Sequence, residues 1–244
     1  ELSDQILDDG GHCELSPMYH QHILSRMLDC YNLAKNNKNI FNDDFILILK
    51  EKSESMLGWI SIMTFNNGDI PLVNDSAFNI YPRTTELINY SKKLSLESIC
   101  VPLNSSGYRK INKENYECVV DIGKIGPDYM PGHSHSDTFN FILFYKNSPF
   151  IVDTGISTYN NCSRRQIERS TSSHNTIKIG NYEQSETWSS FRVSRRVNPK
   201  IIIDKNNEIK AYIDYKNTVA RHVRHFKFSE DNIFINDEIS TSKK

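Results

Sequence analysis

The stretch that decides the fold joins a polar histidine pair, Gly132-His133-Ser134-His135-Ser136-Asp137, to an apolar segment, Phe139-Asn140-Phe141-Ile142-Leu143-Phe144-Tyr145. The apolar segment is rich in residues that favour β-structure and predicts a buried strand ending at Lys146-Asn147-Ser148-Pro149. Side chains two residues apart on an extended chain point to the same face, so we expect His133 and His135 to project together.

Two further polar clusters follow along the chain, Val152-Asp153-Thr154-Gly155 and Ser173-His174-Asn175-Thr176. If neighbouring strands carry these clusters, His135, Asp153 and His174 surround one point. Imidazole and carboxylate groups are ligands that zinc takes in proteins, so this set predicts a site for Zn²⁺ or another divalent ion. His133 is then left over for chemistry. A His-x-His pair alone is more often structural than metal-binding, so that alternative stays open.

The first part of the chain, to about residue 103, has helical spacing of its apolar residues. Ser16 and Pro17 predict a helix start, because serine caps a helix well and proline suits the first helical position. A second helix is predicted over Asp43–Met63, interrupted near Gly58, and a third over Thr85–Leu96. These three helices cannot bury all their apolar faces alone, so they need partners.

From about residue 105 the period changes to the alternation of strands. The segment Arg221–His225 alternates along one of these strands, and we interpret it as one solvated face. The sequence thus predicts an α+β fold, with a helical domain over residues 1–103 and an antiparallel β-sandwich over residues 104–244. Besides the strand before Lys146, the predicted strands are Tyr116–Asp121, Thr176–Ile179, Lys200–Asp204, Glu208–Tyr215, Val219–Phe228 and Asn232–Ile239.

Composition excludes several classes of protein. The formal net charge of −1 provides no basic field for nucleic acid. No apolar run reaches the roughly eighteen residues that a membrane span needs. The five cysteines are scattered, which argues against a disulfide framework and a cysteine metal site. The chain begins at Glu1 without a methionine, so we expect an internal fragment, and the lack of a signal peptide says nothing about its compartment.

Several motifs, in order, resemble those of heparinase II/III-like polysaccharide lyases. The resemblance covers roughly residues 8 to 200 and implies the C-terminal part of an α/α-toroid followed by the central β-sandwich domain. The matching segments are Asp9–His20, Asn74-Asp75 after Gly68-Asp69-Ile70-Pro71, Gly132–Asp137, Phe150–Gly155, Glu168–Thr176 and Gln184–Trp188.

The resemblance implies a bacterial enzyme of the periplasm or cell envelope that cleaves a uronate-containing anionic polysaccharide by β-elimination. Tyr19 would be the catalytic tyrosine and His133 would assist as base. A phenol can exchange a proton if nearby positive charge lowers its pKa from about 10. Without the resemblance, Tyr19 in a first helical turn reads as a core aromatic and His133 as a structural histidine.

Three further residues are predicted to bind substrate. Glu14 can hydrogen-bond sugar hydroxyls, although it can equally balance the dipole at a helix start. Tyr159 can stack on a sugar or simply pack. The guanidinium of Arg169 suits carboxylate or sulfate, or braces the site. The resemblance also implies a carboxylate-neutralising asparagine or histidine upstream of Glu1.

Two other classes remain open. A cupin-like metal enzyme also carries Gly-x-His-x-His motifs, but no suitably placed glutamate follows His135, and the helical first part is unexpected there. The other is a non-catalytic glycan-binding protein of lyase descent. The sequence leaves open the identity of the sugar, endo or exo action and the oligomeric state.

Overall fold

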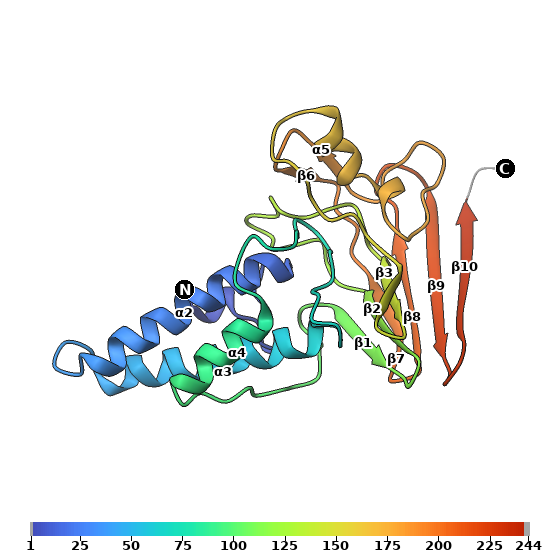
Figure 1. Ribbon diagram of the computed structural model, residues 1–244. Coiled ribbons are helices and arrows are strands. Elements are labelled where there is room, and N and C mark those ends of the chain that lie inside the picture. Colours follow the sequence, from blue (N-terminus) through green and yellow to red (C-terminus); the bar gives the residue numbers. More distant parts are fainter. Residues whose placement is uncertain (1, 242–244) are drawn as a thin grey trace.

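The computed structural model describes residues 2–241, and it places a helical part beside two four-stranded sheets (Figure 1). After a short helix α1 (Leu2–Gln5), the helical part consists of α2 (Pro17–Asn36), α3 (Asp43–Met63) and α4 (Thr84–Lys93). The three helices predicted from apolar spacing are therefore confirmed. None of the described helices is long and apolar enough to cross a membrane.

Helix α3 runs without a break, so the predicted interruption near Gly58 is wrong. Glycine occupies this position because another segment passes close by: a Cβ atom at Gly58 would lie 1.9 Å from the carbonyl oxygen of Ile99. The missing side chain thus allows the segment after α4 to pack directly on the helix.

This contact predicts that Gly58→Ala destabilises the protein, although alanine is the better helix former. Overpacking typically costs about 1–3 kcal/mol, which exceeds the roughly 1 kcal/mol that alanine gains in helix propensity. Urea unfolding followed by circular dichroism measures the change. A more stable variant would show that the Ile99 segment moves away without cost.

The first sheet has the strand order β1 (Tyr108–Asn112), β2 (Tyr116–Asp121), β3 (Phe141–Tyr145) and β4 (Ser148–Ile151). The second has the order β10 (Ile233–Thr241), β9 (Ala220–Phe228), β8 (Glu208–Asp214) and β7 (Lys200–Lys205), and all neighbouring strands in both sheets are antiparallel. Strands β5 (Glu186–Trp188) and β6 (Arg192–Ser194) form a separate hairpin.

Two cores hold the layers together. One core lies between the two sheets and contains Val120 and Phe141 from the first sheet and Ile213 and Phe226 from the second. The other core lies among the helices and reaches Phe144 on the opposite face of the first sheet. The central strands β2 and β3 of the first sheet are therefore buried on both sides, between helices and the second sheet. This arrangement confirms the α+β fold and the sandwich.

Three local predictions need correction. Thr176–Ile179 is not a strand: Asn175 donates side-chain hydrogen bonds to the carbonyls of Phe141 and Val152, and only an isolated bridge joins Ile179 to Tyr182. The segment Gly132–Asp137 is a loop, so strand geometry does not align its histidines.

The third correction concerns Arg221–His225, which does not present one solvated face. His222 and Arg224 lie on the buried face of β9, where both bind the carboxylate of Asp237 on β10. His222 and Arg224 share a face because residues i and i+2 of a strand point the same way. That face can be buried because both basic side chains bind one carboxylate.

Candidate functional site

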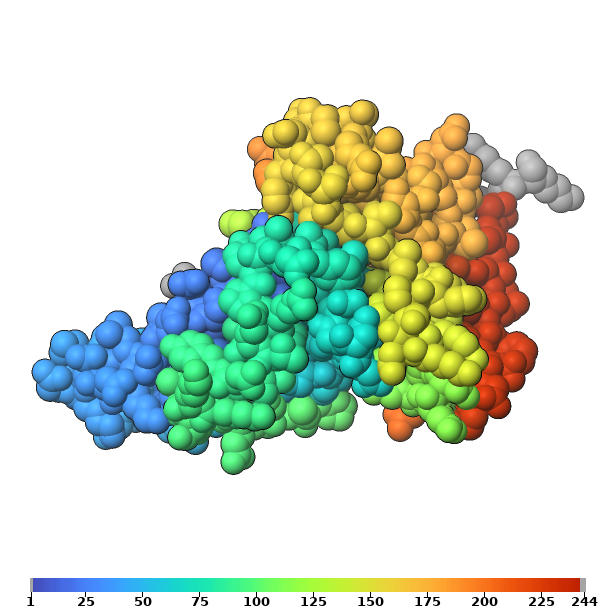
Figure 2. Space-filling view, in the orientation of Figure 1, coloured from blue at the N-terminus to red at the C-terminus, as the bar shows by residue number. Residues whose placement is uncertain are grey.

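The candidate site lies where the helical part meets the loops above the sheets. In Figure 2 the gold segment around α5 (Ser163–Glu168) lies against the teal loop that precedes α4. Ile156 donates a backbone hydrogen bond to the carbonyl of Ser76, 3.1 Å away, across this junction. Gly155 has φ +57° there, and a Cβ atom would lie 2.1 Å from the Ser76 carbonyl oxygen. Only glycine permits such close approach of the two loops.

Asp75, on the teal loop, is the centre of the site. Its fully buried carboxylate accepts hydrogen bonds from His133 Nδ1 at 2.9 Å, His135 Nε2 at 2.8 Å and Arg165 Nη2 at 2.7 Å, and also from Arg165 Nη1. Burial opposes ionisation of Asp75, but the hydrogen bonds from these three side chains outweigh it and hold its pKa well below the usual value. Asp75 is therefore a fixed negative charge.

This charge orients His133. Because Asp75 accepts a hydrogen bond from Nδ1, the neutral ring carries its lone pair on Nε2. His133 Nε2 lies 4.0 Å from Glu14 Oε2, and the His133 side chain is 22% exposed. The backbone supports the same geometry, since Asp75 N donates to the carbonyl of His133. His133 thus turns Nδ1 toward Asp75 and its other ring nitrogen, Nε2, toward Glu14.

Tyr19, in the first turn of α2, lies beside His133. Its ring centroid lies 4.1 Å from that of His133, and its hydroxyl is 2.7 Å from the hydroxyl of Tyr159. Burial raises the pKa of Tyr19, against the effect of the Tyr159 hydrogen bond. The expected lowering of this pKa by positive charge is therefore absent, and the phenol stays protonated at neutral pH.

The N-cap of α2 fixes the position of Tyr19. Ser16 Oγ accepts a hydrogen bond from Tyr19 N at 3.3 Å and donates one to the carbonyl of Asp75 at 2.8 Å. One hydroxyl thus joins the helix start to the loop that carries the central carboxylate. The helix start predicted from Ser16 and Pro17 is therefore attached directly to the site.

We expect Ser16→Ala to lower both stability and turnover. Loss of an N-cap typically costs about 0.5–2 kcal/mol of protein stability. The same change releases the first turn of α2 and the Asp75 loop, so Tyr19 loses its fixed distance to His133. Thermal unfolding and steady-state kinetics measure the two effects, and Ser16→Thr, which keeps the hydroxyl, is the control. Unchanged turnover in Ser16→Ala would show that the cap does not position Tyr19.

The structure brings most of the predicted site residues together. Tyr159 packs near the His133 ring, with centroids 6.2 Å apart, and Glu14 faces His133 from the helical part. Arg169 is different: it is fully buried and donates to the backbone carbonyls of Ser134, Ser189, Ser190 and Arg192. Its predicted contact with substrate is thus corrected to a bracing role, because no part of it is exposed.

The predicted metal ligands also lie close together, but their donor atoms do not converge. His174 Nδ1 is 2.7 Å from Asp153 Oδ2, whereas His135 turns Nε2 toward Asp75, and the two imidazole centroids are 5.3 Å apart. Within residues 2–241 no group of three or more His, Cys, Asp or Glu side chains is arranged to hold a metal ion. Two buried nitrogens, His135 Nδ1 and His174 Nε2, have no hydrogen-bond partner. The residues suit zinc in identity, but not in orientation, so no chemical step is assigned to a metal.

Two residues central to the site were not predicted as site residues. Asp75 lies within the matched Asn74-Asp75 segment, but a loop carboxylate has no periodic pattern, and its partners are 58 to 90 residues away. Arg165 lies four residues before Arg169 in the sequence, but its full burial against Asp75 depends on tertiary structure.

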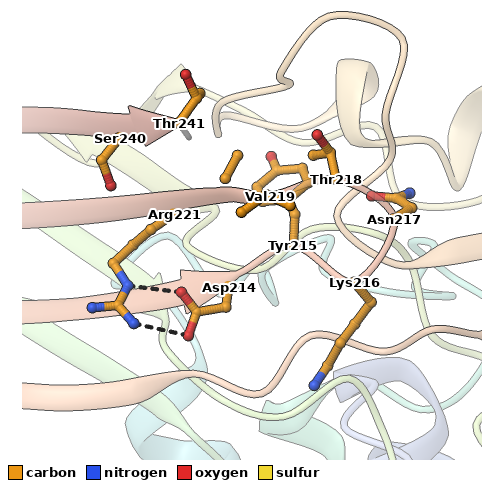
Figure 3. Close-up of a pocket in the computed structure, with 10 residues that line it drawn as sticks. Asp214, Tyr215, Lys216, Asn217, Thr218, Val219, Arg221, Ser240 and Thr241 are labelled. Atoms are coloured by element: carbon orange, nitrogen blue, oxygen red, sulfur yellow. Dashed lines mark hydrogen bonds and ion pairs between the residues drawn. The ribbon is translucent and has the colours of Figure 1, made fainter. Parts of the chain in front are cut away.

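A hollow of about 850 Å³ lies in the second sheet, where β8 ends, β9 begins and β10 ends (Figure 3). Its most polar feature is a two-bonded ion pair between Asp214 and Arg221, with distances of 2.7 and 3.0 Å. The two charges neutralise each other, and neither Tyr19 nor His133 lines the hollow. It therefore adds nothing to the candidate site.

Comparison with known proteins places the whole chain near one group of enzymes. The family model "Heparinase II/III N-terminus" matches residues 1–95, and the model "Heparinase II/III-like, C-terminal" matches residues 100–244. A heparin-sulfate lyase of Bacteroides stercoris is 22% identical to the chain, covering 100% of it and 39% of the relative.

Solved structures of similar fold include a heparinase III with methylated lysines, with a TM-score of 0.75 and 18% identity over 99% of this chain. A second heparinase III structure gives a TM-score of 0.73, with 18% identity over 100% of the chain. The chain spans about 40% of the length of each of these relatives. At this identity, the structural likeness concerns the fold alone.

Proposed function

The chain belongs to the heparinase II/III-like family, and on that premise we propose that it forms the catalytic part of a polysaccharide lyase that cleaves uronate-containing chains by β-elimination. The observation that carries the proposal is the contact of the Tyr19 ring with a His133 whose Nδ1 is held by Asp75. An acid and a base in contact are what elimination needs, because one proton leaves and another is delivered.

In the proposed reaction His133 Nε2 removes the proton on C5 of the uronate. The electron pair forms the C4–C5 double bond as the glycosidic C4–O bond breaks, and the Tyr19 hydroxyl gives its proton to the leaving oxygen. The imidazolium then returns a proton to the phenolate beside it. The raised pKa of Tyr19 supports this division, since the phenol begins the cycle protonated.

The uronate carboxylate must be neutralised for C5 to become acidic, because the transition state resembles an enolate. Arg165 and Arg169, the two buried arginines of the described site, are occupied by Asp75 and by backbone carbonyls. We therefore assign this role to the asparagine or histidine that the family resemblance implies outside residues 1–244. Glu14 and Tyr159 would then bind sugar hydroxyls, in a substrate met in the periplasm or cell envelope.

A panel of uronate polysaccharides, incubated with the whole protein, tests the proposal. Release of unsaturated uronate, followed by ultraviolet absorbance, is the expected result for at least one polymer. Glycan binding without unsaturated product would favour a non-catalytic protein of lyase descent. The cupin-like alternative has lost its basis, since both family models match heparinases.

We also propose that His135, Asp153 and His174 hold a divalent ion, zinc or another, after reorientation of the imidazoles. The two buried, unpartnered nitrogens support this proposal, because such groups usually have a partner. Elemental analysis of dialysed protein is expected to find the metal in the wild type and to lose it in the double variant His135→Ala, His174→Ala. Removal by a chelator should lower the melting temperature, because a ligand of the native state adds stability. A metal-free wild type, or unchanged metal in the double variant, would contradict the site.

A further inference from the structure

A continuous row of aromatic rings crosses the candidate site from the β-part to the helical part. Each ring contacts the next, with centroid distances from 4.1 to 6.3 Å. The reacting pair lies in the middle of the row. In order, the rings are Phe191, Tyr159, His133, Tyr19, Tyr81 and His22.

Phe191 begins the row in the turn between β5 and β6, near α5 in Figure 1. Its ring stacks on Tyr159 at 5.7 Å and meets the edge of His133 at 5.9 Å, and the Arg165 guanidinium lies 5.7 Å from its centroid. A Cβ atom added to Gly132 would touch Phe191 Cβ at 3.5 Å. The ring is thus held from several sides, and yet Phe191 remains 46% exposed.

Tyr81 and His22 form the other end of the row. Tyr81 lies in the loop before α4, and its ring stacks on His22 of α2 at 4.3 Å. The centroid of the Tyr81 ring lies 6.3 Å from that of Tyr19. Tyr81 and Phe191 thus follow and precede the Tyr19–His133 pair in the order of contacts. Both residues are partly exposed. Nothing in the proposed proton transfers uses Phe191, Tyr81 or His22.

We propose that Phe191 with Tyr159, and Tyr81 with His22, are two sugar-stacking platforms on opposite sides of the Tyr19–His133 pair. The inference rests on the proposed lyase function and adds the binding mode: the site takes an internal segment of a polysaccharide and cleaves it in an endo manner. The C–H face of a pyranose ring is apolar, so it packs on aromatic faces while its hydroxyls and carboxylates stay solvated.

The geometry favours a glycan over an apolar protein surface as the occupant. The row carries phenol hydroxyls and imidazole nitrogens beside its apolar ring faces, which suits an amphipathic polymer. It also continues directly into the catalytic pair, so a chain stacked on both ends would carry its scissile bond past Tyr19 and His133. A platform on one side only would instead suit release of terminal units.

Binding and cleavage site are tested with a heparan sulfate dodecasaccharide that is fluorescently labelled at its reducing end. In whole protein carrying Tyr19→Phe, which keeps the ring, we expect Phe191→Ala and Tyr81→Ala each to raise the Kd about tenfold, as loss of a buried aromatic contact predicts. Phe191→Trp should retain affinity. Phe234→Ala, which removes an exposed phenylalanine on β10, is the matched control and should change nothing.

With active protein, the expected products come from internal cleavage, and the two platform variants move the preferred cut in opposite directions relative to the label. Affinities within twofold of the parent, no binding at all, or release of terminal units alone would each overturn the inference. Internal cleavage with unaffected variants leaves the lyase function standing without the platforms. If binding depends on the platforms but no uronate polymer is cleaved, the platforms are supported and the proposed lyase function is contradicted.

Discussion

Tyr19→Phe is expected to fold normally and to lose about 10²–10⁴-fold in turnover, the range typical of a general acid or base. The change removes one hydroxyl and keeps the ring, so packing against His133 and Tyr81 survives. Without the phenol proton the leaving oxygen departs as an alkoxide. Steady-state rates of unsaturated-product formation, with circular dichroism to check folding, measure the effect.

The variant Tyr159→Phe distinguishes the effect of the Tyr19 hydroxyl itself from the effect of its hydrogen bond to Tyr159. It removes the same 2.7 Å contact from the other side but leaves the Tyr19 hydroxyl in place. We expect a loss of only a few fold, because one neutral hydrogen bond contributes about 1 kcal/mol. If Tyr19→Phe kept more than half of the wild-type rate, Tyr19 would be a core aromatic and the acid would have to be another group.

Asp75→Asn is expected to abolish turnover and to destabilise the protein as well. An amide cannot neutralise Arg165, which is fully buried, and removal of one partner of a buried ion pair typically costs about 3–5 kcal/mol. The amide also offers one acceptor oxygen where the carboxylate had two, so the Nδ1 proton of His133 is no longer fixed by a negative charge, and turnover should fall by at least about 10²-fold. Urea unfolding and kinetics, both under conditions where the variant is folded, measure the two losses separately.

Asp237→Asn provides a matched control on the second sheet. Asp237 also accepts hydrogen bonds from an arginine and a histidine, Arg224 and His222, but it belongs to β10, which lies on the other side of the first sheet from α2 (Figure 1). The Asp237→Asn variant should be less stable than the wild type but keep the same turnover per folded molecule. If the two variants lost turnover equally, or if Asp75→Asn kept wild-type kinetics, Asp75 would be a structural carboxylate only.

The sequence predicted what local patterns determine. Helix α2 follows from its Ser16-Pro17 start and apolar spacing, α3 from apolar spacing, and the long strands from alternation of apolar residues. It did not predict β1, or the strand β4 that follows the turn at Lys146 and Asn147, which adopt φ of 47° and 61°. These two left-handed residues make a hairpin turn, so residues interpreted as the end of a strand also begin the next one.

The candidate site was predicted in its residue types, but not in its connections. Tyr19, His133 and Tyr159 lie together as expected. The roles of Asp75 and Arg169 depend on burial, which a single sequence does not report: one carboxylate gathers three basic side chains, and one guanidinium serves backbone carbonyls instead of an anion. Burial determines whether a charged side chain meets substrate or protein.

The most direct test of the central claim is the oxygen balance of the reaction. The whole protein digests a uronate polysaccharide in water enriched in ¹⁸O, the heavy isotope of oxygen. The masses of the products are then measured by mass spectrometry. Elimination by Tyr19 and His133 adds no water, so we predict products whose masses sum to that of the substrate, with an unsaturated new non-reducing end and no heavy oxygen gained at the cleaved bond. Products heavier by one labelled water per cleavage would indicate hydrolysis and contradict the account.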